Sequence, residues 1–231
     1  MDSLFKRDLE GELKNWNLFK AYGHFNLCFE SIIKNFKDLL IEMVKFSYGF
    51  NRDWEDPIYE DVVESHLHDR LLRIILHDDG ANAIVEKCRS CFIDISKPEV
   101  QKLFKENDIE PFPINEDIKI LGEIIFKKAS ELIKTRNILI HTNFDGVVYA
   151  FTSLEKLSGT KDAKTANGFE ERNYELTVEY LENIVEQMEL FDNYMQSFKC
   201  YTLYGANEND TESYNEMMRD FKQMKFTLPK K

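Results

Sequence analysis

Apolar residues recur three or four positions apart over most of this 231-residue chain, a spacing typical of amphipathic helices. The longest series runs from Leu9 to Met43 and predicts one helix over the first 50 residues, with Gly23 as a weak point midway. The chain has only nine glycines and five prolines, fewer than the turns of an all-β sandwich or barrel require. The sequence therefore predicts an all-α fold.

Turn residues and caps divide the rest of the chain into further helices. We expect these at about 59–77, 81–95, 100–105, 115–142 and 178–204. In the first of them, Ile74 and Ile75 lie on the predicted buried side. Ser213 and Glu216 have the spacing of a capping box before a short final helix.

Two β-like segments, 147–154 and 173–178, interrupt the helices. They flank a polar insert at 155–172, which we interpret as part of a loose hairpin. We expect the tip of this insert and the 205–212 linker to be the most mobile segments. The predicted organisation is one helical domain over 1–204, with a hairpin insert at 147–178, followed by a linker and short helix at 205–231.

The charge balance limits the function classes. Thirty basic and 42 acidic residues give a net charge of −12 at pH 7. A protein that binds nucleic acid through a broad electrostatic surface normally carries a basic face. This class is therefore disfavoured, whereas a small local phosphate site is not excluded.

Apolar runs and cysteines indicate the compartment. No apolar run approaches the roughly 18 residues that span a bilayer, and the N-terminus has no signal-peptide pattern. Among four cysteines, only Cys88 and Cys91 form a CxxC pair, which disfavours a structural zinc site. We expect reduced thiols, cytoplasmic localisation and no membrane partner.

One residue breaks the apolar pattern of the helix that starts near Asn115. At 100° per residue, Arg136 falls in line with Ile118 at the centre of the apolar stripe. Its guanidinium cannot lose its charge and therefore needs an anionic partner. Asn137 and His141 are four residues apart and share a neighbouring face, so this helix end combines a cation, an amide and an imidazole.

Two interpretations of this helix end remain open. Arg136 could form a structural ion pair with a carboxylate of a neighbouring helix, with His141 as an ordinary C-terminal residue favoured by the helix dipole. Alternatively, these residues form a site.

The string RNILIH, from Arg136 to His141, resembles the R-x4-6-H signature of the HEPN superfamily, in which the residue after the Arg is commonly Asn, Asp or His; here it is Asn137. Its position also resembles that family, near the end of a long helix and before a hairpin and one more long helix. The resemblance covers about residues 1–204. It implies a helical bundle of four to five main helices, with a small β-hairpin after the motif helix.

The resemblance implies a metal-independent endoribonuclease that needs no cofactor and leaves a 2′,3′-cyclic phosphate. Arg136 would hold the scissile phosphate, His141 would transfer a proton, and Asn137 would orient the imidazole or bind a phosphate oxygen. Arg136 and His141 are about 140° apart on one helix, so two copies would line one cleft in a homodimer. A toxin or anti-phage effector, with an antitoxin or nucleotidyltransferase partner, is the expected role. The alternative is a non-catalytic dimeric interaction module.

Weaker candidates for contacts with the RNA substrate lie outside this motif. His66 and Arg70 are one turn apart on the predicted second helix, although a solvated helix face explains them as well. Tyr149 follows the motif closely and could stack on a base, or else pack within the hairpin.

Overall fold

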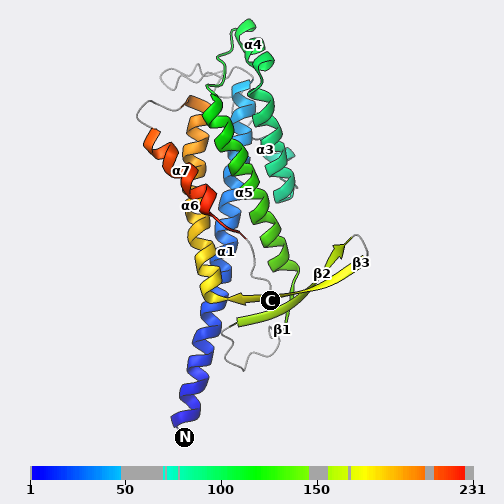
Figure 1. The fold of residues 1–231 in the computed structure, drawn as a ribbon, viewed down its shortest axis with the longest axis vertical. Helices are drawn as coiled ribbons and strands as arrows, with labels where there is room; N and C mark the ends of the chain where they lie inside the picture. Colours follow the sequence, from blue (N-terminus) through cyan, green and yellow to red (C-terminus); the bar gives the residue numbers. More distant parts are fainter. Residues whose placement is uncertain are drawn as a thin grey trace. The chain divides into compact units, whose positions relative to one another are not determined.

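The computed structural model describes residues 2–47, 70, 72–77, 79–145, 156–165, 168–205 and 211–226. This part of the chain is mostly helical, which confirms the predicted all-α class (Figure 1). The helices are α1 (Asp2–Ser47), α3 (Ala81–Ile95), α4 (Pro98–Glu106), α5 (Glu116–His141), α6 (Val178–Tyr204) and α7 (Thr211–Gln223). The strands are β1 (Asn143–Asp145), β2 (Lys156–Thr165) and β3 (Gly168–Thr177).

Several helix boundaries agree with the sequence signals. Helices α3 and α6 have the predicted bounds, and α4 is longer than the predicted turn. Gly205 ends α6 because it adopts φ 85°, a conformation that glycine tolerates, and its N–H donates to the carbonyl of Tyr201 at 3.1 Å. Helix α1 continues through Gly23 without a break.

The chain forms two compact units, each built from separated segments. Unit 1 contains residues 1–30, 131–190 and 224–231, and unit 2 contains residues 31–130 and 191–223. Helices α1, α5 and α6 contribute residues to both units.

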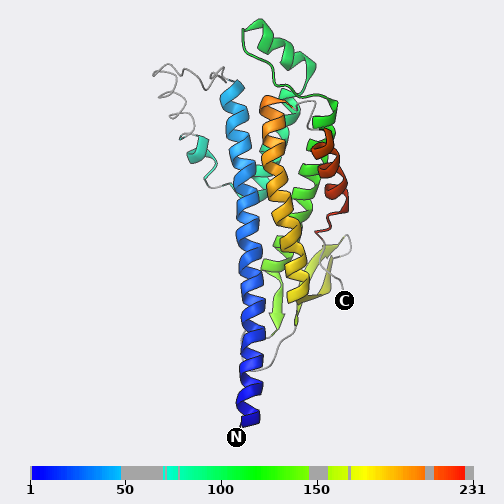
Figure 2. The same cartoon turned by 90° about the vertical axis from the view of Figure 1, so that its left-hand side faces the viewer.

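Unit 2 is organised around buried phenylalanines from α1, α3, α5, α6 and α7. Their rings lie 5.3–6.4 Å apart between centroids, within the usual range for aromatic pairs. These residues are Phe36, Phe92, Phe126, Phe191, Phe198 and Phe221. Within this unit α1 and α6 run side by side (Figure 2), and Ser31 and Asn35 donate to Asp192 at 2.8 and 2.6 Å.

Gly122 on α5 lies against this aromatic cluster. A Cβ atom there would come within 2.6 Å of Phe92 and 3.3 Å of Phe198. We expect Gly122→Ala to lower the free energy of unfolding by about 1–3 kcal/mol, because overpacking outweighs the gain in helix propensity. The matched control is Gly23→Ala on α1, where no atom lies within 4 Å, so a gain of about 0.5–1 kcal/mol is expected. Urea denaturation of both variants tests this, and equal effects would contradict it.

Unit 1 contains the sheet. Its order is β1-β2-β3, and both pairs are antiparallel (Figure 1). Tyr174 and Leu176 alternate on β3 and are both buried, as expected when one face of a strand packs inward.

The hairpin differs from its prediction. The polar insert expected to be loose forms β2 and the first half of β3, and the two strands pair from Lys156↔Thr177 to Thr165↔Gly168. Backbone hydrogen bonds form this ladder without requiring apolar side chains, so a polar stretch can pair. The predicted strand at 147–154, the tip at 166–167 and the linker residues 206–210 lie outside the described residues.

Two smaller predictions are wrong. Helix α7 begins at Thr211, so Ser213 lies inside its first turn and does not cap it. Ile74 and Ile75 are exposed, whereas Leu76 is buried, so the buried side of this segment differs from the predicted one.

Candidate functional site

The residues of the RNILIH motif occupy the last turns of α5, in unit 1. Asn115 starts this helix, since its Oδ1 accepts a hydrogen bond from the N–H of Ile118 at 2.9 Å. The acidic Glu116 and Asp117 stand in the first turn, where negative charge suits the helix dipole. The helix ends at His141, and Thr142 closes it by donating to the carbonyl of Ile138 at 2.6 Å.

Arg136 is a half-buried cation stacked on an aromatic ring. Its Cζ lies 5.3 Å from the centroid of Phe29, which belongs to α1. Such cation–π contacts contribute about 0.5–2 kcal/mol but do not neutralise the charge. Within the described residues, no carboxylate lies within 4.0 Å of the guanidinium. The structural ion pair considered from the sequence is therefore absent from this part of the chain.

One hydrogen-bond donor of the Arg136 guanidinium, Nε, has no acceptor among the described residues. This nitrogen is buried. Nη1 donates to Oδ1 of Asn137 at 3.4 Å, a long and weak bond. A buried donor without an acceptor is costly, and a bound anion would satisfy it.

His141 and Asn137 differ in exposure. His141 is exposed and Asn137 is half-buried. An exposed imidazole can exchange protons with solvent or with a bound molecule, as acid–base catalysis requires. The structure thus links Asn137 to Arg136 and leaves the His141 ring accessible.

Of the three weaker candidates, the structure describes only Arg70. Arg70 is exposed and belongs to unit 2, whereas Arg136 belongs to unit 1. On the same predicted helix, Arg73 forms an ion pair with Asp38 at 3.1 Å. His66 and Tyr149 lie outside the described residues.

A C-terminal segment that the sequence set apart from the domain packs beside the motif. Thr135, the residue before Arg136, donates its hydroxyl to the carbonyl of Phe226, and both residues are buried. The N–H of Lys225 donates to Oε1 of Gln187 on α6 at 2.7 Å. The alternation of Met224, Lys225 and Phe226 is the sequence signal that could have predicted this buried segment.

The CxxC pair, Cys88 and Cys91, lies on α3, and neither cysteine belongs to a group of three potential metal ligands among the described residues. All four cysteines are free of disulfides in the structure. Burial raises the pKa of the Cys88 thiol well above its usual range. Burial, followed by the charge of Asp94, raises the pKa of Cys91 to about 11. Both thiols are therefore protonated near neutral pH in the metal-free protein.

No family model matches the chain, and no curated protein or solved structure matches it. Among the described helices, none is both long and apolar enough to cross a membrane.

Proposed function

We propose that this protein is an HEPN-type endoribonuclease that cleaves RNA without a metal ion and acts as a homodimer. The observation that supports this most directly is the end of α5. There, Arg136 is a half-buried cation with no carboxylate partner among the described residues, and an exposed imidazole follows at His141. The buried Nε of Arg136 suits an anionic ligand, and an RNA phosphate has the required charge and acceptors.

The proposed reaction uses the RNA's own hydroxyl as nucleophile. The 2′-oxygen of a ribose forms a bond to the adjacent phosphorus, and the bond from that phosphorus to the next 5′-oxygen breaks. His141 accepts the proton of the 2′-hydroxyl, and a second His141 donates a proton to the leaving 5′-oxygen. Arg136 stabilises the charge that develops on the phosphoryl oxygens. The products are a 2′,3′-cyclic phosphate and a 5′-hydroxyl.

A homodimer supplies both imidazoles. Arg136 and His141 diverge by about 140° around one helix, so a single copy presents them poorly to one phosphate. Two motif helices related by a two-fold axis would place two Arg136 and two His141 residues around one cleft. Such a cleft is basic locally, although the chain carries a net charge of −12.

The dimer is testable through an exposed apolar residue next to His141. Ile140 is 38% exposed at the end of α5, while Ile120 is 42% exposed near its start. We expect Ile140→Glu to convert the dimer to a monomer, because it buries a charge in the interface. Ile120→Glu is the matched control and should leave the dimer intact. Light scattering after size-exclusion chromatography measures both, and a monomeric wild type at micromolar concentrations would count against this interface.

The activity is tested by incubating the purified chain with total cellular RNA in excess EDTA. We expect cleavage to continue and the new 3′ ends to resist enzymatic tailing until the cyclic phosphate is removed. A requirement for added Mg²⁺, or free 3′-hydroxyl ends, would contradict the mechanism. By the same resemblance, the cellular role is that of a toxin or anti-phage effector, held in check by an antitoxin or nucleotidyltransferase.

One observation favours a second candidate, a non-catalytic dimeric interaction module. The stacking of Arg136 on Phe29 could serve packing alone. In that case the chain cleaves no RNA, and Arg136→Ala changes only the free energy of unfolding.

A further inference from the structure

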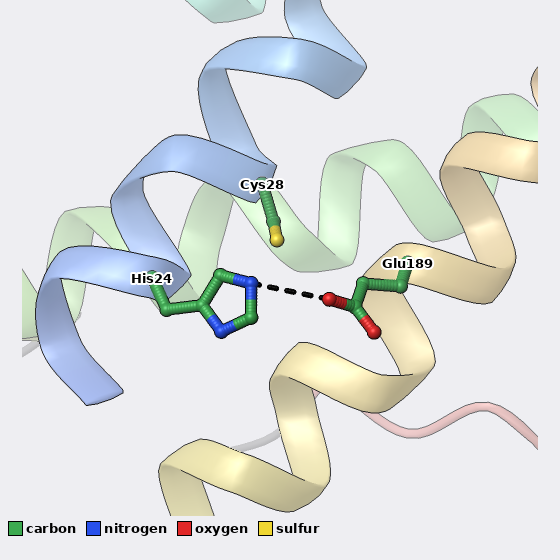
Figure 3. Close-up of side chains that lie close together, drawn as sticks. All are labelled: His24, Cys28 and Glu189. Atoms are coloured by element: carbon green, nitrogen blue, oxygen red, sulfur yellow. Dashed lines mark ion pairs between the residues drawn. The ribbon is translucent and has the colours of Figure 1, made fainter. Parts of the chain in front are cut away.

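A group of three potential metal ligands lies in unit 1, outside the motif on α5. His24 and Cys28 come from α1 and Glu189 from α6, and their side chains point toward one another (Figure 3). Their ligand atoms all lie within 4.8 Å of one another, and Nε2 of His24 lies 3.1 Å from Oε1 of Glu189. Among the described residues, no other group of three His, Cys, Asp or Glu side chains meets this criterion.

Helix geometry explains why these side chains converge. Residues four apart on a helix lie on the same face, so His24 and Cys28 present a nitrogen and a sulfur ligand one turn apart. In a tetrahedral zinc site, neighbouring ligand atoms are about 3.3–3.6 Å apart, given metal–ligand bonds of about 2.0–2.3 Å. In the observed group the ligand atoms lie within 4.8 Å of one another, and the nitrogen–oxygen distance is 3.1 Å, so small shifts would bring them to that geometry.

We propose that His24, Cys28 and Glu189 bind a Zn²⁺ ion, with water as the fourth ligand. One sulfur, one imidazole nitrogen and one carboxylate oxygen form a donor set that suits zinc, whereas Mg²⁺ and Ca²⁺ prefer oxygen ligands only. The site is distinct from the proposed catalytic residues, and the inference does not rest on the proposed function.

A surface ion pair between His24 and Glu189 explains the arrangement of the three side chains less completely than a bound metal ion does. The side chains of His24 and Glu189 are each 52% exposed, and exposed ion pairs contribute at most about 1 kcal/mol. The sulfur of Cys28 lies within the same group as these two side chains. A metal ion uses all three side chains.

The bound ion would join α1 to α6 within unit 1. Cys28 precedes Phe29, the residue on which Arg136 stacks. Zinc would therefore hold the segment of α1 that supports this arginine. Binding to the folded state alone raises stability, and an ion present at about 100 times its dissociation constant should raise the melting temperature by roughly 5–10 °C.

Cobalt(II) is a suitable probe, because a cobalt–thiolate site has a charge-transfer band and intense visible bands when four-coordinate. The full-length chain is stripped with EDTA, transferred to metal-free buffer with a non-chelating reductant, and titrated with Co²⁺. We expect both sets of bands to saturate at one ion per chain and to disappear on addition of Zn²⁺. A weak spectrum typical of hydrated Co²⁺ would overturn the proposal.

Variants assign the ligands. Cys28→Ser should abolish the charge-transfer band, and His24→Gln and Glu189→Gln should weaken Co²⁺ binding more than about tenfold. His24→Gln and Glu189→Gln replace half-exposed side chains, so the fold should tolerate them. Cys200→Ser and Cys91→Ser are the matched controls and should keep the full spectrum. If the charge-transfer band survives in Cys28→Ser, the ion binds elsewhere and the proposed site is refuted. Loss of this band in Cys91→Ser would refute the site as well.

Thermal unfolding provides a second readout that does not involve RNA. Zn²⁺ should raise the melting temperature of the wild type and of Cys200→Ser, but not that of Cys28→Ser. No shift in the wild type would contradict a stabilising ion. Failure here leaves the ribonuclease proposal untouched, because cleavage in EDTA is expected whether or not this site is filled.

Discussion

His141→Ala and Arg136→Ala will each reduce RNA cleavage by at least about 10²-fold, the lower range for loss of a general acid–base group or of a charge-stabilising donor. The two side chains act on the same phosphate in different ways, so neither replaces the other. Rates of cleavage of a labelled RNA in EDTA provide the measurement. If the protein is toxic to cells, both variants should also restore growth.

The controls separate a catalytic role from a general effect of charge. Lys134→Ala removes an exposed cation two residues before Arg136 on the same helix and should leave the rate within about twofold. Arg136→Lys should not rescue cleavage, because an ammonium group lacks the planar fork that binds two phosphate oxygens. His77→Ala, which removes an exposed imidazole of unit 2, is the control for His141.

Folding of the variants must be checked in the same preparations. His141 is exposed, so its replacement should change the free energy of unfolding by less than about 0.5 kcal/mol. Arg136→Ala loses the contact with Phe29 but also removes a half-buried charge, and we expect it to remain folded and dimeric. Cleavage that survives His141→Ala would refute the mechanism and favour the non-catalytic module.

Phe226→Ala will lower the free energy of unfolding by about 3–5 kcal/mol, although the residue lies close to the C-terminus. Phe226 is only 1% exposed, and its carbonyl accepts the hydroxyl of the buried Thr135. Replacing a buried phenylalanine by alanine removes apolar contacts and leaves a cavity. A loss of this size is a large part of the roughly 5–15 kcal/mol that stabilises a typical domain.

The matched control for this variant is the neighbouring residue. The side chain of Lys225 is exposed, and its contact with Gln187 uses the backbone N–H, which alanine retains. Lys225→Ala should therefore change stability by less than about 0.5 kcal/mol. Chemical denaturation measures both variants, and similar midpoints would show that this segment contributes no packing to unit 1.

Much of the helical framework follows from local sequence signals. The bounds of α3 and α6, and the Asn115 cap of α5, agree with their predictions because periodicity and capping act between residues a few positions apart. The same local reasoning identified Arg136 as a charge within an apolar stripe. Local reasoning did not predict the exposure of Ile74 and Ile75, which depends on packing. It also did not predict the polar strand β2, which depends on pairing with β3.

The sequence by itself determined that most of the described chain is helical and that Arg136, Asn137 and His141 lie in the last turns of one helix, α5. Only the tertiary structure decided that Phe29, rather than a carboxylate, lies against Arg136 within the described residues. It also decided that the carbonyl of Phe226 accepts a hydrogen bond from Thr135 and that Glu189 lies beside His24 and Cys28. Helix periodicity and capping depend on short-range hydrogen bonds and side-chain spacing, which can be read along the chain. Contacts between distant segments depend on how all the buried surfaces pack together, and no local pattern specifies that arrangement.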